Sequence, residues 1–563
     1  MRLASVLSIS AGLALSLANA QTSQPEKPAA SAVQQPKPAA KAAPPEMPPE
    51  SKAFTDASRI MDPVKKIEAL EQWQKDYPNA SNLSSADELI LSTLIERFPR
   101  QRERIRKLAK SMYRGARPDQ KSGMANRLAN TLLEGDAFLK DAEHYAKIGV
   151  SSLTQAGYLE QQHKQYARRK QKPPKDEDLL KRFRETRADR IATLGRVYFK
   201  MGLTARARPL LEQSYGVVPD QPVVAAALGD LSWKAGDESK ALDYLMPALL
   251  SGRPAATAIA KPDVEALYRK THGGSLDGFD AMLDAEYHKR YPNPVPVEPY
   301  KASDKRSDRL VLAEVFTGSG CPPCVGADLA FDAALERYSR SQLAVVMYHV
   351  HVPQPDPMTT AETPDLSKAY GVRGVPTYFI DGKEIGGGGG GRDYAKNVYQ
   401  RFNPAIEKDL ETPADAKIAA TAHVEGNTVQ VKAAVSDVKS ESKDLKVVVL
   451  LLEKQIRYTG ENGIRFHPMV VRAVGGAKLS VDGIEQKFDL DAVSASLKTS
   501  LDDYQAKGHR GKVFKFTEKK YQIDRGNLAV AVFLKNENDQ HVLQAAYIDL
   551  GSAPVEHRIT ETK

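Results

Sequence analysis

The sequence predicts an all-α region, an α/β region and an all-β region, in that order along the chain. Apolar residues recur at helical spacing over 53–290, with few strand signals. Strands and helices alternate over 307–410, and the apolar spacing changes to every second residue over 413–553. Closely spaced prolines stiffen the stretch 291–306, which we expect to be the linker between the first two regions.

The first 20 residues have the pattern of a secretory signal peptide, 1–20. Arg2 precedes an apolar run over Leu3–Leu17, and Ala18–Ala20 provides small residues for cleavage. We expect export, to the periplasm, with no membrane span after cleavage, and an uncleaved anchor is the alternative. Residues 21–52 are mostly Pro, Ala, Lys, Gln, Ser and Glu, a composition that predicts a disordered linker.

The charge balance excludes one class of partner. A net charge of +9 arises from 80 basic and 71 acidic side chains, a small excess for 563 residues. A nucleic-acid-binding protein would show a basic stripe with interleaved aromatic residues, and the sequence has none. Its densest basic stretch, 168–182, also contains acidic residues and indicates a solvated helical face or a loop. We therefore expect no nucleic-acid partner.

One internal repeat lies in the helical region. Three features recur 34 residues apart: Leu194-Gly195 as Leu228-Gly229, Gly202 as Gly236, and Ala207 as Ala241. Small residues would let two antiparallel helices approach closely, and the two single glycines would allow the turn between them. Over 190–250 the pattern resembles tetratricopeptide repeats, with a looser copy near 128–142. The resemblance implies a region that binds a partner protein, and a packed helical spacer is the alternative.

Both cysteines of the chain lie in one tetrapeptide, Cys321-Pro322-Pro323-Cys324. Two thiols at this spacing can close a small disulfide ring, and a helix beginning in the motif would favour a thiolate at the first sulfur. The second sulfur would then resolve a mixed disulfide. A structural zinc site needs four ligands, and no other cysteine exists. An inert structural disulfide and metal handling with His351 are the other readings.

The segments around this motif predict alternating strands and helices. In order, we expect a strand over 310–316, a helix from Cys321 to Tyr338, a strand over 343–348, a short helix over 366–370, a hairpin over 377–385 and a helix over 393–410. Asp381-Gly382 has the composition of a two-residue hairpin turn. This order is typical of an α/β fold.

Residues 370–377, Tyr-Gly-Val-Arg-Gly-Val-Pro-Thr, resemble the cis-proline segment of thioredoxins, and with the C-x-x-C motif the resemblance covers 305–410. It implies a thioredoxin-like fold in which a cis Pro376 lies beside the nucleophilic Cys321. The backbone at Val375 would then hydrogen-bond an extended substrate strand. The resemblance further implies a substrate-binding surface formed by Val375, Thr377, Gly320, Pro322 and Pro323. Gly320 stands where thioredoxins carry tryptophan.

A second departure concerns the buried acid that assists the resolving cysteine in thioredoxins. No acid is in perfect register, and Glu314 on the apolar strand is the nearest candidate to accept the proton of Cys324. Glu314 could instead face solvent or pair with a lysine. Because Pro322 and Pro323 have no N–H, few donors remain to stabilise a thiolate, and we predict a Cys321 pKa near the ~7 of thioredoxin.

Two further segments near the motif have open readings. Residues 349–358 make a longer connection than a thioredoxin needs and would form either a rim over the motif or a plain surface loop. The six consecutive glycines at 386–391 predict a slack hinge before the last helix. A phosphate-binding loop would need a lysine and a Ser or Thr directly afterwards, and Arg392-Asp393 follows instead.

The C-terminal region predicts a β-sandwich. Alternating patterns occupy 418–424, 428–432, 446–453, 469–474, 528–535 and 542–550. The Glu-x-Phe-Thr-Gly approach to the cysteines and the segment His467–Arg472 together resemble exported bacterial thioredoxin-like proteins with an immunoglobulin-like C-terminal domain. That resemblance implies docking by the sandwich.

Together these features predict an exported thiol–disulfide oxidoreductase that acts on protein thiols and disulfides. The redox-active disulfide Cys321–Cys324 would be its only redox group, with no metal and no cofactor. The helical repeats and the sandwich would bind partners. A non-catalytic adaptor is the alternative. The enzyme reading requires Pro376 close to Cys321, and it requires that the two sulfurs are not both sealed from solvent.

Overall fold

The computed structural model describes residues 47–551, so the expected signal at 1–20 and most of the expected linker at 21–52 lie outside the described residues. The chain divides into a short unit, 1–48, and a large unit, 49–563, to which all elements below belong. Its first helix begins at Pro49, and proline is well suited to a first helical turn. Within the described part of the chain, no helix combines the length and the apolar character that crossing a membrane requires.

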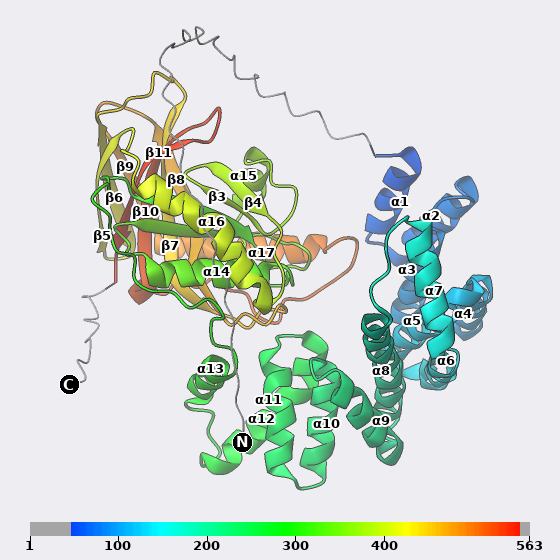
Figure 1. Cartoon of the computed structure of the whole chain (residues 1–563). Coiled ribbons are helices and arrows are strands. Elements are labelled where there is room, and N and C mark those ends of the chain that lie inside the picture. Colours follow the sequence, from blue (N-terminus) through cyan, green and yellow to red (C-terminus); the bar gives the residue numbers. More distant parts are fainter. Residues whose placement is uncertain (1–46, 552–563) are drawn as a thin grey trace, which may run out of the picture. The chain divides into compact units, whose positions relative to one another are not determined.

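Helices fill the region that was predicted to be all-α (Figure 1). They are α1 (Pro49–Arg59), α2 (Pro63–Asp76), α3 (Leu83–Arg97), α4 (Arg102–Gly115), α5 (Lys121–Leu133), α6 (Leu139–Ser151), α7 (Gln155–Arg168), α8 (Asp176–Lys200), α9 (Thr204–Val217), α10 (Pro222–Lys234), α11 (Glu238–Leu250), α12 (Pro254–Thr271) and α13 (Phe279–Arg290). Apolar residues at helical spacing explain their packing. In α2, for example, Ile67, Leu70 and Trp73 share one buried face.

The predicted repeat corresponds to two consecutive helix pairs, α8 with α9 and α10 with α11. A Cβ atom on Gly195 would lie 2.9 Å from a methyl carbon of Leu211, and one on Gly229 would lie 2.5 Å from a methyl carbon of Leu245. Gly202 and its counterpart in the second pair have positive φ angles, of 72° and 84°. Close approach and tight turns therefore explain the repeated glycines, as predicted.

The α/β region has the expected order of elements: β1 (Val311–Thr317), α14 (Cys324–Arg337), β2 (Leu343–His349), α15 (Thr363–Ala369), β3 (Thr377–Ile380), β4 (Lys383–Gly387) and α16 (Ala395–Leu410). Strand β1 runs parallel to β2 and antiparallel to β3, and β3 and β4 form a hairpin. Asp381 and Gly382 form its turn with φ angles of 44° and 79°, which confirms the two-residue hairpin. Side chains of α14 and α16 pack with Val311, Ala313 and Val315 on one face of β1.

The predicted C-terminal strands are present, but four of them extend the α/β sheet. They are β5 (Lys417–Glu425), β6 (Thr428–Ser436), β7 (Leu445–Arg457), β8 (Phe466–Lys478), β9 (Ile484–Asp489), β10 (Leu528–Asn536) and β11 (Val542–Asp549), and a helix α17 (Leu490–Lys507) that was not predicted follows β9. One eight-stranded sheet has the order β11-β10-β7-β8-β2-β1-β3-β4. The other three strands form a sheet of order β5-β6-β9 that packs against β7 and β10.

Strands β2 and β8 join the α/β and β-rich parts of this sheet through a parallel pairing at Met347 and Val470. Without β8, strand β2 would be an edge with open N–H and C=O groups, and such edges are normally covered. A buried arginine adds a second connection, because Arg309 donates to the carboxylates of Asp381 and Asp415 at 3.1 and 3.0 Å. One of the two sheets formed by the strands of 413–553 therefore also contains the strands of the α/β region.

Candidate functional site

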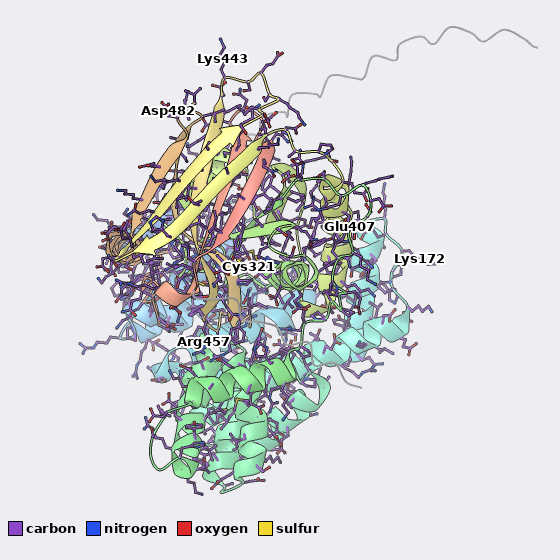
Figure 2. The ribbon with its side chains drawn as sticks, turned by 90° about the vertical axis from the view of Figure 1, so that its left-hand side faces the viewer. Lys172, Cys321, Glu407, Lys443, Arg457 and Asp482 are labelled. Atoms are coloured by element: carbon purple, nitrogen blue, oxygen red, sulfur yellow. A yellow bond between two sulfur atoms is a disulfide. The ribbon has the colours of Figure 1, made fainter. Side chains whose placement is uncertain are left out.

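The Cys321–Cys324 pair forms a disulfide bond directly after strand β1. Cys321 N–H donates to the Gly318 carbonyl at 3.0 Å, and Cys324 N–H donates to the Cys321 carbonyl at 3.1 Å. Helix α14 begins at Cys324, three residues later than predicted. The two prolines between the cysteines have no N–H to donate, so the tight turn through them precedes the regular helix. Cys321 is labelled in Figure 2, which draws the surrounding side chains.

The Val375–Pro376 peptide bond is cis, as predicted, and it lies beside the motif. The Sγ atom of Cys321 is 3.7 Å from the carbonyl oxygen of Val375. Thr377 begins β3, pairs with Phe316 of β1, and donates its hydroxyl to the Gly374 carbonyl at 2.7 Å. The fold thus brings together the residues that the sequence assigned to one site on the cis-proline side.

Both cysteines are buried in this state of the molecule. Cys321 is 1% exposed and Cys324 is 0% exposed, although Pro322 and Pro323 between them are exposed. The sequence-based enzyme reading required that the sulfurs not both be sealed from solvent, and this arrangement does not meet that requirement. Exchange with a protein substrate therefore needs a movement that uncovers Cys321.

The glycine run 386–391 covers the helix side of the motif. Gly390 N–H donates to the Pro323 carbonyl and Gly326 N–H donates to the Gly390 carbonyl, both at 2.9 Å. A Cβ atom on Gly389 would lie 2.0 Å from the Pro323 carbonyl oxygen and 3.1 Å from Pro376 Cγ. The predicted slack hinge is therefore, in this state, a segment packed tightly against the motif, and only glycine fits at that distance.

Two other loops close the opposite side of the motif. In the 349–358 connection, Gln354 lies where a side chain on Gly320 would point, because a Cβ atom on that glycine would lie 2.8 Å from the Gln354 Cβ. In the β7–β8 loop, Asn462 N–H donates to the Ser319 carbonyl at 3.0 Å. The 349–358 connection therefore forms part of the rim. Lys443 and Asp482, labelled in Figure 2, mark loops at the far end of the strands from Cys321.

Glu314 lies on the other face of β1. It lies on the same face of the strand as Leu312 and Phe316, which belong to a core separate from the one that contains α14. Its Oε1 accepts hydrogen bonds from Tyr348 at 3.1 Å and Tyr370 at 2.7 Å, and burial raises the pKa of its carboxyl. Glu314 is fully buried and is not solvent-facing. Its role as proton acceptor for Cys324 stays a prediction, from a position that faces away from the helix carrying Cys324.

A second buried carboxyl, which the sequence reasoning missed, lies on α14 itself. Asp328 comes one helical turn after Cys324, and its Oδ1 accepts a hydrogen bond from the Thr317 hydroxyl at 2.6 Å. Burial raises its pKa to about 7, while the Thr317 hydroxyl and the nearby His349 act in the opposite direction. The signal was present in the sequence as an acid four residues after the second cysteine, between the apolar residues Ala327 and Leu329 of the helix.

Asp356 holds a histidine beside this carboxyl. One of its oxygens, Oδ2, lies 3.0 Å from His349 Nδ1 and accepts the Ser319 N–H at 2.6 Å, while Oδ1 accepts the Met358 N–H at 2.9 Å. Burial alone would raise the pKa of Asp356, but the His349 ring and the two N–H groups hold it well below its usual range. The carboxylate therefore stays ionised and receives the Nδ1 proton of His349 as a hydrogen bond.

Two more histidines border the cluster. His467 of β8 packs edge-on against His349, with ring centroids 5.2 Å apart, and burial lowers its pKa to about 3. His351 accepts the Asp356 N–H at 2.9 Å, and burial lowers its pKa to about 4. Both rings are therefore neutral near pH 7. Among the described residues, no group of three or more His, Cys, Asp or Glu side chains is arranged to hold a metal ion.

Comparison with known proteins adds a weak likeness to solved structures. No family model matches the chain, and no curated protein matches it. Among solved structures, HBP35 of Porphyromonas gingivalis matches with a TM-score of 0.31 and 15% sequence identity, over 47% of this chain and 82% of that chain.

Proposed function

We propose that the chain is an exported thiol–disulfide oxidoreductase that exchanges disulfides with protein substrates through Cys321 and Cys324. The observation that carries the proposal is the position of the Cys321 sulfur, 3.7 Å from the Val375 carbonyl that precedes the cis Pro376. The disulfide of a C-x-x-C motif supplies a sulfur that a substrate thiolate can attack. The backbone before the cis-proline beside it supplies hydrogen-bonding groups for an extended substrate strand.

The disulfide state of the motif defines one direction of the reaction. A substrate thiolate attacks Cys321 Sγ, a mixed disulfide forms, and the Cys321–Cys324 bond breaks with Cys324 leaving as a thiolate that takes up a proton. A second substrate thiolate then attacks the substrate sulfur of the mixed disulfide and releases Cys321 as a thiolate. The substrate dithiol is oxidised and the motif is reduced. The reverse sequence reduces a substrate disulfide at the expense of the motif dithiol.

Insulin reduction in the presence of a dithiol reductant tests the activity, and reoxidation of a reduced substrate tests the other direction. The full chain should accelerate at least one of them, and Cys321→Ser should abolish that acceleration. Cys324→Ser should instead accumulate the mixed disulfide, because the resolving sulfur is gone. Absence of activity in both directions from the intact chain would refute the proposal.

The burial of both sulfurs favours a second candidate, a non-catalytic adaptor whose α/β region is a docking platform. The two readings differ in how readily the disulfide exchanges. An exchanging site opens, so the folded chain should be reduced by a protein dithiol without denaturant. If the disulfide is reduced only after the chain is denatured, that result would support the adaptor.

A further inference from the structure

The cis-proline loop, residues 370–376, connects α15 to β3. Its start is fixed on α15, because the Val372 N–H donates to a carbonyl of that helix at 2.9 Å. Among the described residues, however, the N–H groups of 373–375 make no backbone hydrogen bond. The Val375 carbonyl lies beside Cys321 Sγ in this stretch. Its position therefore depends on the contacts that the side chains of the loop make.

Three side chains of the loop point away from the cysteine motif. Tyr370 is 8% exposed and belongs to the core on the other face of β1, to which β7, β8 and β10 also contribute, and Val372 and Val375 pack against that core. The Tyr370 ring lies with its centroid 5.4 Å from that of Phe316 and 5.1 Å from that of Phe379. The loop is thus attached to a core that it shares with the C-terminal strands.

The Tyr370 hydroxyl joins two buried charged side chains in this core. It donates to Glu314 Oε1 at 2.7 Å, and Lys535 Nζ of β10 donates to the hydroxyl oxygen at 3.3 Å. Glu314 is 0% exposed and Lys535 is 7% exposed. Lys535 Nζ also donates to Gln540 Oε1 at 2.8 Å and lies 4.6 Å from the centroid of the Tyr370 ring. Lys535 is outside 305–410, the stretch that resembles thioredoxins.

This arrangement is expensive for a site that only fills space. A carboxyl and an amino group lose their hydration when they are buried, and apolar side chains of similar size would pack there at lower cost. Burial raises the pKa of Glu314 and lowers that of Lys535, while each group opposes the shift of the other. Hydrogen bonds to a buried side chain also require one geometry, so they hold the Tyr370 hydroxyl in one place.

We propose that Glu314 and Lys535 position the cis-proline loop through the Tyr370 hydroxyl. The position that they fix places the Val375 backbone where an extended substrate strand binds beside Cys321. This inference rests on the proposed function and concerns its substrate-binding step. Glu314 is then a positioning residue that acts through Tyr370, and it takes no proton from a cysteine. Removing the hydroxyl should weaken substrate binding and leave the cysteine chemistry intact.

Steady-state insulin reduction by the full chain tests the proposal. Tyr370→Phe keeps the ring and removes the hydroxyl. It should raise KM about tenfold, in line with the loss of one hydrogen bond to a buried carboxyl. The value of kcat should hold, because the substrate strand is bound equally before and during the reaction. Lys535→Met should raise KM by a smaller factor, about threefold. A wild-type KM in Tyr370→Phe would overturn the proposal.

Tyr348→Phe is the matched control. The Tyr348 hydroxyl donates to the same Glu314 oxygen, Oε1, at 3.1 Å, and it is fully buried, but Tyr348 belongs to β2 and not to the loop. Tyr348→Phe therefore removes a comparable hydrogen bond from the same core without releasing the loop. It should leave KM at the wild-type value. An equal rise of KM in both tyrosine variants would show an effect of the core in general and would refute the positioning role.

Two substitutions of Glu314 separate positioning from proton transfer. Glu314→Gln keeps an oxygen that can accept the Tyr370 hydroxyl, so its KM should lie between those of wild type and Tyr370→Phe. Glu314→Leu keeps no acceptor, and its KM should rise at least as far as that of Tyr370→Phe. If Glu314→Gln instead lowers kcat at an unchanged KM, the acid serves proton transfer and the positioning role is wrong.

Hydrogen exchange measures the attachment of the loop without any substrate. The N–H groups of Gly371 and Val372 donate to carbonyls of α15, both at 2.9 Å, directly after Tyr370. Their exchange should be about tenfold faster in Tyr370→Phe than in Tyr348→Phe. Equal exchange in the two variants, with an active wild type, would count against the positioning role alone. The expected difference in a wild type that reduces no insulin would count against the proposed function alone.

Discussion

Gly389→Ala should loosen the cover over the disulfide. The added Cβ would lie 2.0 Å from the Pro323 carbonyl oxygen, so the glycine run 386–391 must move outward by about 1.4 Å to reach an ordinary 3.4 Å contact. The φ angle of Gly389 is not positive, so the effect comes from this contact rather than from the backbone conformation. Overpacking of this kind costs about 1–3 kcal/mol. That movement also lengthens the hydrogen bond from Gly390 N–H to the Pro323 carbonyl.

This cost should appear as faster reduction of the disulfide. If the strain is relieved when the segment opens, the open fraction rises about tenfold for each 1.4 kcal/mol, or roughly 5-fold to 150-fold in all. Reduction of the folded chain by a water-soluble phosphine, followed by alkylation and mass spectrometry, measures that fraction. Hydrogen exchange of the 386–391 amides measures the opening directly.

Gly374→Ala is the control, because a Cβ at Gly374, beside the same cis-proline segment, would meet nothing within 4 Å. It should be reduced at the wild-type rate. Gly389→Ala reduced at the wild-type rate, with unchanged amide exchange over the glycine run, would show that the run does not control access to Cys321. The tight packing of that run would then be unrelated to the reactivity of the motif.

Three other predictions concern stability. Arg309→Ala should destabilise the sheet region by about 3–5 kcal/mol above pH 7, because it leaves the Asp381 carboxylate buried without its cation. The loss of stability should shrink at lower pH, because burial raises the pKa of Asp381 to about 7 and the carboxyl can take up a proton. Amide exchange across the sheet, measured at several pH values, reports the loss and its pH dependence. A loss that does not change with pH would contradict the assignment. Gly229→Ala should destabilise the helical region by about 1–3 kcal/mol through overpacking, whereas Gly216→Ala, with nothing within 4 Å, should stabilise it by about 0.5–1 kcal/mol. Both tryptophans lie in this region, so denaturant unfolding followed by their fluorescence checks the two signs. Finally, the raised pKa of Asp328 contributes stability that is fully present below pH 3.8 and is lost as pH rises through about 7. In Asp328→Asn this decrease of the unfolding free energy with rising pH should be absent, and an unchanged decrease would contradict the assignment.

Local patterns in the sequence predicted most of the elements. The Asp381-Gly382 turn, the alternating strands after residue 413 and the repeated helix pairs each depend on a few neighbouring residues, and each is present. The cis state of Val375–Pro376 followed from a family resemblance and is also present. Strand ends and helix starts differ by a few residues, as at Cys324, where two prolines delay the regular helix.

Pairings between distant segments were not accessible in the same way. Alternation shows which face of a strand is buried, but it does not show which strand lies beside it. The joining of β8 to β2 therefore appeared only in the structure. Glu314 illustrates the importance of strand faces. The residues directly before and after it on β1 face α14, whereas Glu314 itself points to the other side of the sheet.

The shared sheet changes what the C-terminal strands contribute to the site. Strand β8 places the His467 ring against His349, and the β7–β8 loop places Asn462 on the Ser319 carbonyl at the entrance to the motif. A free-standing α/β domain would leave the edge of β2 open and the His349 ring without this neighbour. The β-rich region therefore completes the burial of the cysteine motif and of the polar side chains beneath it, so cutting the chain near residue 411 should uncover both.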